Sequence, residues 1–520
     1  MTGRRYLKFL VRHPREVQSM SSSTFFRSML TTIADRGRAL LRRHGPMVGD
    51  LLEDAARLMP LTVKTPPKRD LPTLCDTLLS GRGEASGVAL AEQILDQWDA
   101  LDEAGRRTFL LDLAYRFGPD PIKLDKAIDA YRAAPGAATA LALHTAAEAR
   151  RQELFRRLNL APGGTEAVVR MREALFKVMA GAQGVEKAGL EAVDADLSHL
   201  LASWFNRGFL VLRHIDWTTP ANILEKIIRY EAVHTIRDWN DLRRRLAPSD
   251  RRCFAFFHPQ LLDDPLIFVE VALAPDIPAS IDALLAEDRA PMAAEDATTA
   301  VFYSISNCQE GLRGVSFGNF LIKQVVEDLR GELPNLRTFV TLSPVPGFAG
   351  WLAKERKDEG SAVLPPADKA ILAALDQPGW HQDPGTAATV SPVLLQAAAH
   401  YFLKAKGRGG KPVDPVARFH LGNGARLERL NFLGDLSAKG LAQAYGLMVN
   451  YLYKLDDIEI NHERYADRGE VVAASAVRRH LKADVEAEET KPPPKAKTGG
   501  GTGEGAAKRA RRTAAAQPPA

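Results

Sequence analysis

The sequence predicts an α+β protein: an N-terminal all-α helical bundle followed by a mixed α/β domain. Two observations indicate this fold class. Apolar residues recur at helical spacing almost throughout 71–206, whereas short β-branched and aromatic runs alternate with helical segments from Gly208 onward. At 520 residues and 45% hydrophobic composition, the chain can bury more than one large core. We therefore predict a helical domain over 70–206 and an α/β domain over 207–485.

The segment from Leu71 to Asn206 predicts a bundle of six to eight helices. Helical spacing is clear in runs such as ALAEQILDQWDAL, RRTFLLDLAYRF and LSHLLASWF. Glycine and proline breakers separate the runs at 81–83, 118–119, 135–136 and 162–164, which predicts short loops. No cluster of reactive side chains stands out in this segment, and His144 is typical of a surface or packing residue.

The first 69 residues predict a basic, partly helical segment. Positions 1–45 hold ten Lys or Arg against two acidic residues, and they include the run SSSTFF. One interpretation is an organelle transit peptide, which would make the protein mitochondrial. The other is an amphipathic helix from about Ser23 to Arg43 with a Ser cap. The Ala-, Arg- and Gly-rich composition favours a bacterial, cytoplasmic protein.

The C-terminal segment 490–520 explains the positive charge of the chain. From Lys491 to Ala520 there are seven basic residues and Glu504, a sum of +6, whereas the whole chain sums to +5. The remainder is therefore at −1, and the basic charge does not indicate a nucleic-acid-binding face. Rich in Pro, Gly, Ala and Lys, this segment is expected to be disordered. Its KRARR run leaves open a nucleic-acid or localisation patch.

The cysteine count and the hydropathy pattern exclude other classes. Cys75, Cys253 and Cys308 include no CxxC pair, which argues against a disulfide framework or a zinc ribbon and favours three reduced thiols. No run approaches the roughly 18 apolar residues that a membrane span requires. We predict neither a membrane span nor a specific nucleic-acid partner.

The segment from Thr299 to Phe348 carries the clearest chemical signal. Ala300–Ser306 is typical of a buried strand, apolar residues recur at helical spacing through Leu333, and Thr338–Leu342 is again strand-like. Three glycines fall between the first strand and the helix, at 311, 314 and 318. A glycine turn that opens a helix presents free backbone N–H groups to an anion, which predicts a pyrophosphate cradle. The alternative is a βαβ unit with ordinary turn glycines.

The RGVSFGN run resembles the acyl-CoA pyrophosphate loop of the GCN5-related acetyltransferase fold. That resemblance implies that two neighbouring parallel strands splay apart and that the pantetheine arm lies between them. The substrate-binding residues that it implies are Arg313, Gly314, Val315, Ser316, Phe317, Gly318 and Asn319.

Further ordered motifs resemble the malonyl-CoA decarboxylase family. They include WFNRGFLVL, HPQLLDDPLIFVEVAL, FYSISNCQEGL, TLSPVPGF and the run from Val416 to Tyr453, and the similarity extends from about Leu71 to Leu481. The resemblance implies a catalytic domain of GCN5-related acetyltransferase type, malonyl-CoA as substrate, and a helical domain that assembles a dimer or tetramer. It also implies that Ser343 and His420 are catalytic and that Ser343 contacts substrate.

The chemistry of decarboxylation suits these residue types. Loss of CO2 leaves a carbanion that spreads onto the thioester carbonyl, so the thioester is the electron sink and neither a metal nor a cofactor is required. A histidine can protonate the α-carbon, and a serine can bond to the carboxylate or the enolate. We expect both residues at the ends of strand-like runs. Alternatively, Ser343 is only a turn residue and His420 is a buried core histidine. A Ser–His hydrolase is a further interpretation, but no GxSxG elbow surrounds Ser343.

Two other functions remain open at this stage. An N-acetyltransferase would use the same cradle with a base near the acceptor amine, and a non-catalytic acyl-CoA sensor would keep the cradle without needing both Ser343 and His420. Asn423, Tyr303 and Tyr451 are further candidates for the pocket, although a structural role is the simpler interpretation of each.

Overall fold

The computed structural model describes residues 70–81, 83–315 and 321–481. The predicted basic segment 1–69, with its helix from Ser23 to Arg43, and the segment 490–520 lie outside the described residues. Within the described ranges, no helix combines the length and apolar character needed to cross a bilayer.

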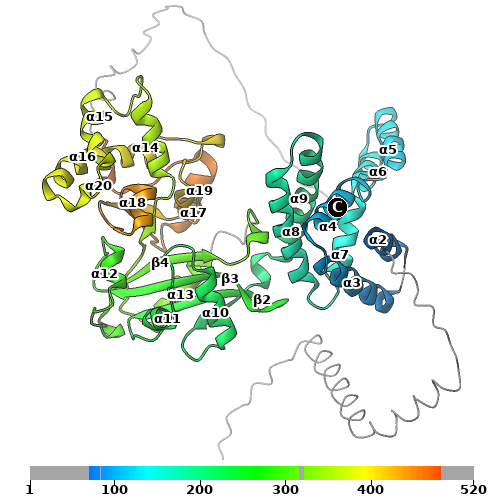
Figure 1. The fold of residues 1–520 in the computed structure, drawn as a ribbon, viewed down its shortest axis with the longest axis horizontal. Coiled ribbons are helices and arrows are strands. Elements are labelled where there is room, and N and C mark those ends of the chain that lie inside the picture. The colour runs from blue at the N-terminus through cyan, green and yellow to red at the C-terminus, as the bar shows by residue number, and fades with distance from the viewer. Residues whose placement is uncertain (1–69, 82, 316–320, 482–520) are drawn as a thin grey trace, which may run out of the picture. The chain divides into compact units, whose positions relative to one another are not determined.

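Eight helices occupy the first part of the described chain, and Figure 1 shows them in blue to green. Their bounds are α2 Leu71–Leu79, α3 Glu84–Asp99, α4 Glu103–Tyr115, α5 Pro121–Ala133, α6 Ala137–Ala147, α7 Arg150–Leu158, α8 Gly164–Gly181 and α9 Gly184–Trp204. Asp102 and Asp120 cap α4 and α5 by accepting backbone N–H bonds at 2.8 and 3.1 Å. Large side chains such as Trp98, Phe117 and Phe155 are buried between the helices.

An eight-stranded sheet follows, in the order β1-β2-β3-β4-β5-β8-β6, with β7 paired to β8. Its strands are β1 Val211–Ile215, β2 Arg251–His258, β3 Leu261–Ala274, β4 Thr299–Asn307, β5 Thr338–Thr341, β6 Ser343–Pro344, β7 Arg426–Asn431 and β8 Met448–Leu452. The pairs from β1 to β4 are antiparallel, β4 and β5 are parallel, and β8 runs antiparallel to its neighbours. The predicted class, a helical part followed by a mixed α/β part, is confirmed.

The parallel strands β4 and β5 diverge. They pair from Thr299 with Thr338 to Phe302 with Thr341, and the Leu342 N–H then donates to the Phe302 carbonyl at 3.0 Å. Beyond this point β4 continues to Asn307, whereas the segment that follows β5 enters β6 and pairs with β8. The splayed pair expected from the resemblance is therefore present.

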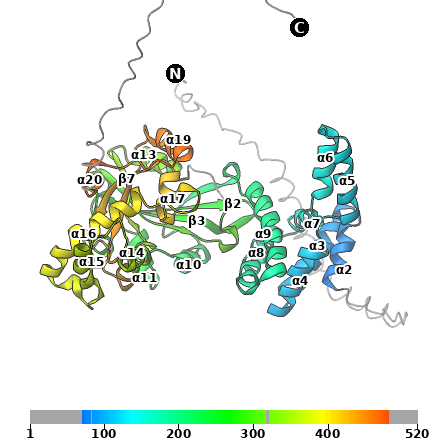
Figure 2. The same ribbon diagram turned by 90° about the horizontal axis from the view of Figure 1, so that it is seen from above.

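Helices cover both faces of the sheet (Figure 2). Helix α13, Leu321–Glu332, connects β4 to β5 and packs in the same core as Phe302 and Phe339. Helices α10, Ala221–Tyr230, and α11, Trp239–Leu246, pack against the residues of β2 and β3 that point the other way. Alternation along the strands sends successive side chains to these two separate cores.

Of the other helices in the described chain, four lie between β6 and β7, and the rest precede β4 or follow β7. Their bounds are α12 Ile281–Leu285, α14 Phe348–Lys357, α15 Pro366–Leu372, α16 Pro384–Leu403, α17 Pro415–Gly422, α18 Ala438–Ala444, α19 Ile458–Arg468 and α20 Ser475–Arg478. The described residues also form six short 3-10 turns: η1 Arg207–Phe209, η2 Ala294–Asp296, η3 Glu310–Leu312, η4 Ala373–Asp376, η5 Trp380–Gln382 and η6 Arg408–Gly410. Residues 363–392 contain α15, η4, η5 and part of α16.

The expectation that His420 ends a strand was wrong, because the residue lies in helix α17. Asp414 caps this helix by accepting from the Ala417 N–H at 2.8 Å, and Pro415 occupies the first turn. A proline in the first helical turn costs no hydrogen bond and fixes a helical φ, so the local sequence starts a helix here.

Candidate active site

The two residues predicted to be catalytic meet in the folded chain. The Ser343 Oγ lies 3.2 Å from the His420 Nε2, although 77 residues separate them in the sequence. Ser343 begins β6, and His420 lies on the buried side of α17. Both side chains are buried, at 5% and 3% exposure. The distance is that of a hydrogen bond, so the two groups can act together.

Two tyrosines complete the surroundings of His420. The Tyr453 hydroxyl lies 2.8 Å from the His420 Nδ1, and the Tyr451 ring stacks on the imidazole with 4.6 Å between the ring centroids. Tyr451 is in β8 and Tyr453 directly follows it, so period-two alternation sends both side chains to the same face. Sequence reasoning missed Tyr453, and the alternation of YLY is the signal that would have found it.

Burial and hydrogen bonding together assign the protonation of His420. Burial lowers the pKa of the imidazole to about 3, which keeps the ring neutral near pH 7. The Ser343 hydroxyl donates to the Thr341 Oγ1 at 2.9 Å, so the Ser343 oxygen is left to accept from the His420 Nε2–H. A neutral imidazole carries one N–H, and the Nδ1 therefore accepts from the Tyr453 hydroxyl. The order of donation runs from Tyr453 through His420 and Ser343 to Thr341.

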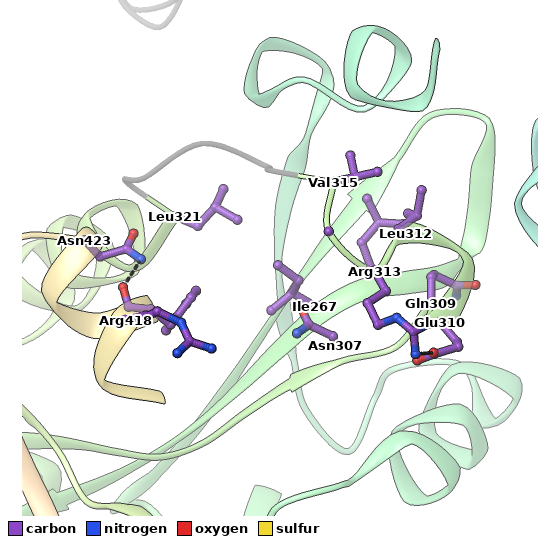
Figure 3. Close-up of a pocket in the computed structure, with 14 residues that line it drawn as sticks. Ile267, Asn307, Gln309, Glu310, Leu312, Arg313, Val315, Leu321, Arg418 and Asn423 are labelled. Carbon is purple, nitrogen blue, oxygen red and sulfur yellow. Dashed lines mark hydrogen bonds and ion pairs between the residues drawn. The ribbon is translucent and has the colours of Figure 1, made fainter. Parts of the chain in front are cut away.

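A pocket of about 400 Å³ lies beside this cluster, and Figure 3 shows the residues around it. Its lining residues are Leu266, Ile267, Asn307, Gln309, Glu310, Leu312, Arg313, Gly314, Val315, Leu321, Arg418, Phe419, Gly422 and Asn423. Three of the eight predicted substrate-binding residues, Arg313, Gly314 and Val315, line it. Figure 3 shows Arg313 and Val315 on the same side of the pocket. Ser316, Phe317, Gly318 and Asn319 lie outside the described residues.

Helix α17 connects the pocket to the buried pair. Its residues Arg418, Phe419 and Gly422 line the pocket, whereas His420 points into the core toward Ser343. The lining stops short of Ser343 and His420 themselves. One short helix therefore presents one face to the pocket and the other to the Ser–His pair.

The other candidates lie in different places. Asn423 lines the pocket, and its Nδ2 donates to the Phe419 carbonyl at 2.7 Å. Tyr303 is buried in a separate core with Val340 and Met448.

The turn before the pocket loop needs glycine for two different reasons. Gly314 has a φ of +80°, a conformation that side chains with a Cβ rarely adopt. At Gly311 a Cβ would lie 2.1 Å from the Val169 carbonyl oxygen of α8. Gly314 therefore shapes the loop, and Gly311 allows the loop to approach α8.

Metal and thiol chemistry have no assembled site in the described part of the chain. No three His, Cys, Asp or Glu side chains come together there as a metal ion would need. Cys75, Cys253 and Cys308 are free and buried, and burial raises the pKa of each thiol. The reaction's independence of metals and cofactors stays a prediction.

Comparison with known proteins gives consistent results along the chain. Residues 208–491 match the malonyl-CoA decarboxylase C-terminal domain, and residues 117–205 match the corresponding N-terminal domain. The mitochondrial malonyl-CoA decarboxylase of Anser anser anser is 36% identical over 349 residues, which cover 63% of this chain and 68% of that protein.

Solved structures are similar over a larger share. The malonyl-CoA decarboxylase of Rhodopseudomonas palustris is 62% identical with a TM-score of 0.76, covering 79% of this chain and 98% of that one. That of Agrobacterium vitis is 61% identical with a TM-score of 0.75, covering 79% and 100%. These matches make the chain a carboxy-lyase. It belongs to the malonyl-CoA decarboxylase family. Because the relatives include a protein named mitochondrial and proteins of bacteria, the cellular location stays a prediction, as does the oligomeric state.

Proposed function

We propose that the chain decarboxylates malonyl-CoA to acetyl-CoA and CO2, with Ser343 and His420 as the catalytic residues. One observation carries the proposal: the buried contact between Ser343 and His420 at 3.2 Å, in a member of this family, beside a pocket whose wall includes the glycine loop. The CoA part of the substrate occupies the pocket, and the acyl end reaches the pair along the divergence of β4 and β5.

The first chemical step breaks the bond between the carboxylate and the α-carbon. Its electron pair moves to the thioester carbonyl, which gives an enolate and releases CO2. When substrate binds, the Ser343 hydroxyl rotates away from the Thr341 Oγ1 and donates its hydrogen bond to the carboxylate or to the enolate oxygen instead. Preorganised donors of this kind contribute roughly 3–4 kcal/mol to a transition state in which negative charge develops on oxygen. Burial strengthens the interaction, because little water competes for the donor.

The second step forms the new C–H bond. His420 donates its Nε2 proton to the α-carbon, and the Tyr453 hydroxyl supplies a proton to the Nδ1 as the first one leaves. A neutral imidazole is a weak acid, but the enolate carbon is a strong base, so the transfer is favourable. Neutral histidines whose environment suppresses the imidazolium form act as hydrogen-bond or proton donors in other enzymes as well. Solvent then returns the proton to Tyr453.

The decisive experiment is incubation of the purified chain with malonyl-CoA alone in D2O. We expect acetyl-CoA, CO2 and one solvent deuterium in the acetyl methyl group. An N-acetyltransferase would release no CO2 without an acceptor amine, and an acyl-CoA sensor would bind the thioester without consuming it. Either result would contradict the proposal. Ser343→Ala protein is the matched control for contaminating activity, because the variant differs by one oxygen atom.

A further inference from the structure

A buried arginine of the helical part contacts the loop that enters the pocket. Arg172 lies on α8, and its side chain is 3% exposed. Its Nη1 donates to the Gly311 carbonyl at 2.9 Å and to the Arg313 carbonyl at 3.0 Å. Its Nε donates to the Asp194 carboxylate of α9 at 2.7 Å. One guanidinium thus joins two helices to both carbonyls of the turn.

Other groups of α8 hold the same turn. The Gly311 N–H donates to the Glu173 carboxylate at 3.2 Å. Two guanidinium groups lie over the Phe176 ring: that of Arg172 is 4.8 Å from the ring centroid, and that of Arg313 is 4.2 Å from it. These contacts fix the backbone and the first side chain of the loop from the helical side.

The bond to the Arg313 carbonyl determines where the next N–H points. A peptide unit is planar and trans, so its C=O and N–H point in opposite directions. Because the Arg313 oxygen is held toward Arg172, the Gly314 N–H points away from α8. Gly314 lines the pocket, and backbone N–H groups in such turns bind phosphate oxygens.

We propose that Arg172 is a positioning residue for the CoA pyrophosphate, acting from the helical part through the backbone of 311–314. The inference rests on the proposed function, because it assumes that the pocket takes CoA. Arg172 touches no substrate itself. It holds the turn so that the Gly314 N–H is already oriented when the pyrophosphate arrives, and the helical part is therefore a component of the substrate site.

A purely structural role for Arg172 makes a different prediction. A destabilised chain would lose activity toward every substrate alike, whereas a misplaced phosphate cradle would weaken only substrates that carry phosphate. Malonyl-pantetheine has the reacting thioester without the pyrophosphate. Comparison of its KM with that of malonyl-CoA separates the two roles.

The test uses Arg172→Gln and Arg172→Lys in the full chain. Arg170→Gln is the matched control, since Arg170 lies two residues earlier on α8, is 64% exposed and pairs only locally with Glu166. We expect the KM for malonyl-CoA to rise about tenfold in Arg172→Gln, in line with loss of a charged hydrogen bond. The turnover number and the KM for malonyl-pantetheine should stay within about twofold of the parent, and Arg170→Gln should match the parent throughout.

An unchanged KM for malonyl-CoA, or equal increases with both substrates, would overturn the inference. If Arg172→Gln does not fold, Arg172→Lys gives the same comparison, because lysine keeps the charge without the forked geometry. If the parent chain does not decarboxylate malonyl-CoA, the proposed function fails. Calorimetric titration of the parent and of Arg172→Gln with CoA and with pantetheine still tests the positioning. Weaker binding of CoA alone by the variant supports it. The same CoA affinity in variant and parent, or an equal loss with both ligands, contradicts it.

Discussion

The His420 Nδ1 and the Tyr453 hydroxyl lie 2.8 Å apart, although one belongs to a helix and the other follows a strand. The contact fixes the orientation of the imidazole and leaves its Nε2 facing Ser343. A histidine held at both nitrogens can pass a proton at one and regain it at the other.

Removal of the imidazole should affect the chemical step more than binding. In His420→Ala we expect turnover to fall by about 10²-fold or more, because proton donation acts mainly in the transition state. The KM for malonyl-CoA should change little. Steady-state kinetics with a circular dichroism check of folding give the answer. Near-full turnover in a folded variant would mean that the proton donor lies elsewhere.

Loss of the Ser343 hydroxyl should also lower turnover. For Ser343→Ala we expect a decrease of roughly 10–10³-fold, because the carboxylate or enolate loses a donor. In the double variant with His420→Ala, the loss should be smaller than the product of the single losses, since the two residues act as a unit. Multiplicative losses would show that they act independently.

The two tyrosines near His420 allow a paired test of a hydrogen-bonded hydroxyl against one without a partner among the described residues. Tyr453→Phe removes the hydrogen bond to Nδ1, and we expect turnover to fall by about tenfold or more. Tyr451→Phe keeps the ring stacked on the imidazole and removes a hydroxyl that has no hydrogen-bond partner among the described residues. Its turnover should stay near that of the parent. Equal turnover in the two variants would show that the hydrogen bond from the Tyr453 hydroxyl to Nδ1 makes no specific contribution.

The pH dependence of stability should include a contribution from His420. Its pKa is about 3 in the folded chain, against an ordinary value of 6.5. Between these values the unfolded state binds more protons, so the free energy of unfolding decreases as pH falls from 6.5 toward 3. Denaturant titrations should show a weaker decrease in His420→Gln than in the parent. An identical decrease would contradict the depressed pKa.

The same pKa predicts the shape of the activity profile. Because His420 is already neutral at pH 6.5, its titration should produce no acid limb between pH 5 and 8. The measurement is kcat/KM across this range in the parent and in Tyr453→Phe. A limb near pH 6.5 would indicate that the imidazolium form is populated in the free protein.

Substitution at Gly314 should weaken CoA binding. Its φ of +80° is unfavourable for a β-branched residue, so Gly314→Val should distort the turn and raise the KM for malonyl-CoA. Space does not oppose the change, since a Cβ at this position would meet no atom within 4 Å beyond its chain neighbours. Gly331→Val is the matched control, because that glycine also has open space but lies in α13. Unchanged CoA affinity in Gly314→Val would remove the cradle from the mechanism.

Much of the architecture could be predicted from the residue pattern. The strand at 300–306 and the helix after it follow from apolar spacing, which burial enforces directly. The expectation that His420 ends a strand-like run was wrong, because the residue lies in helix α17. The Asp414-Pro415 pair, a helix start signal, indicates the correct structure.

The site was less accessible to sequence reasoning. Ser343 and His420 were selected through a family resemblance, and their contact depends on how β6, β8 and α17 assemble. Tyr453 was not selected, because the contact of its hydroxyl with the His420 Nδ1 depends on where the fold places α17 relative to β8. Arg172 gave no signal of this role, because its partners in the loop are backbone carbonyls 139 and 141 positions away along the chain. Contacts to backbone leave no trace in side-chain chemistry.

The divergence of β4 and β5 leaves an open strand edge inside the protein. Beyond Phe302, in the described part of the chain, no strand pairs with β4 on the side that β5 has left. Exposed strand edges attract extended molecules, which pair with them as an additional strand. The pantetheine arm of CoA is such a molecule, since it is extended and carries amide groups. A bound thioester would then supply the neighbour that β4 lacks, and the substrate would complete the sheet before it reacts.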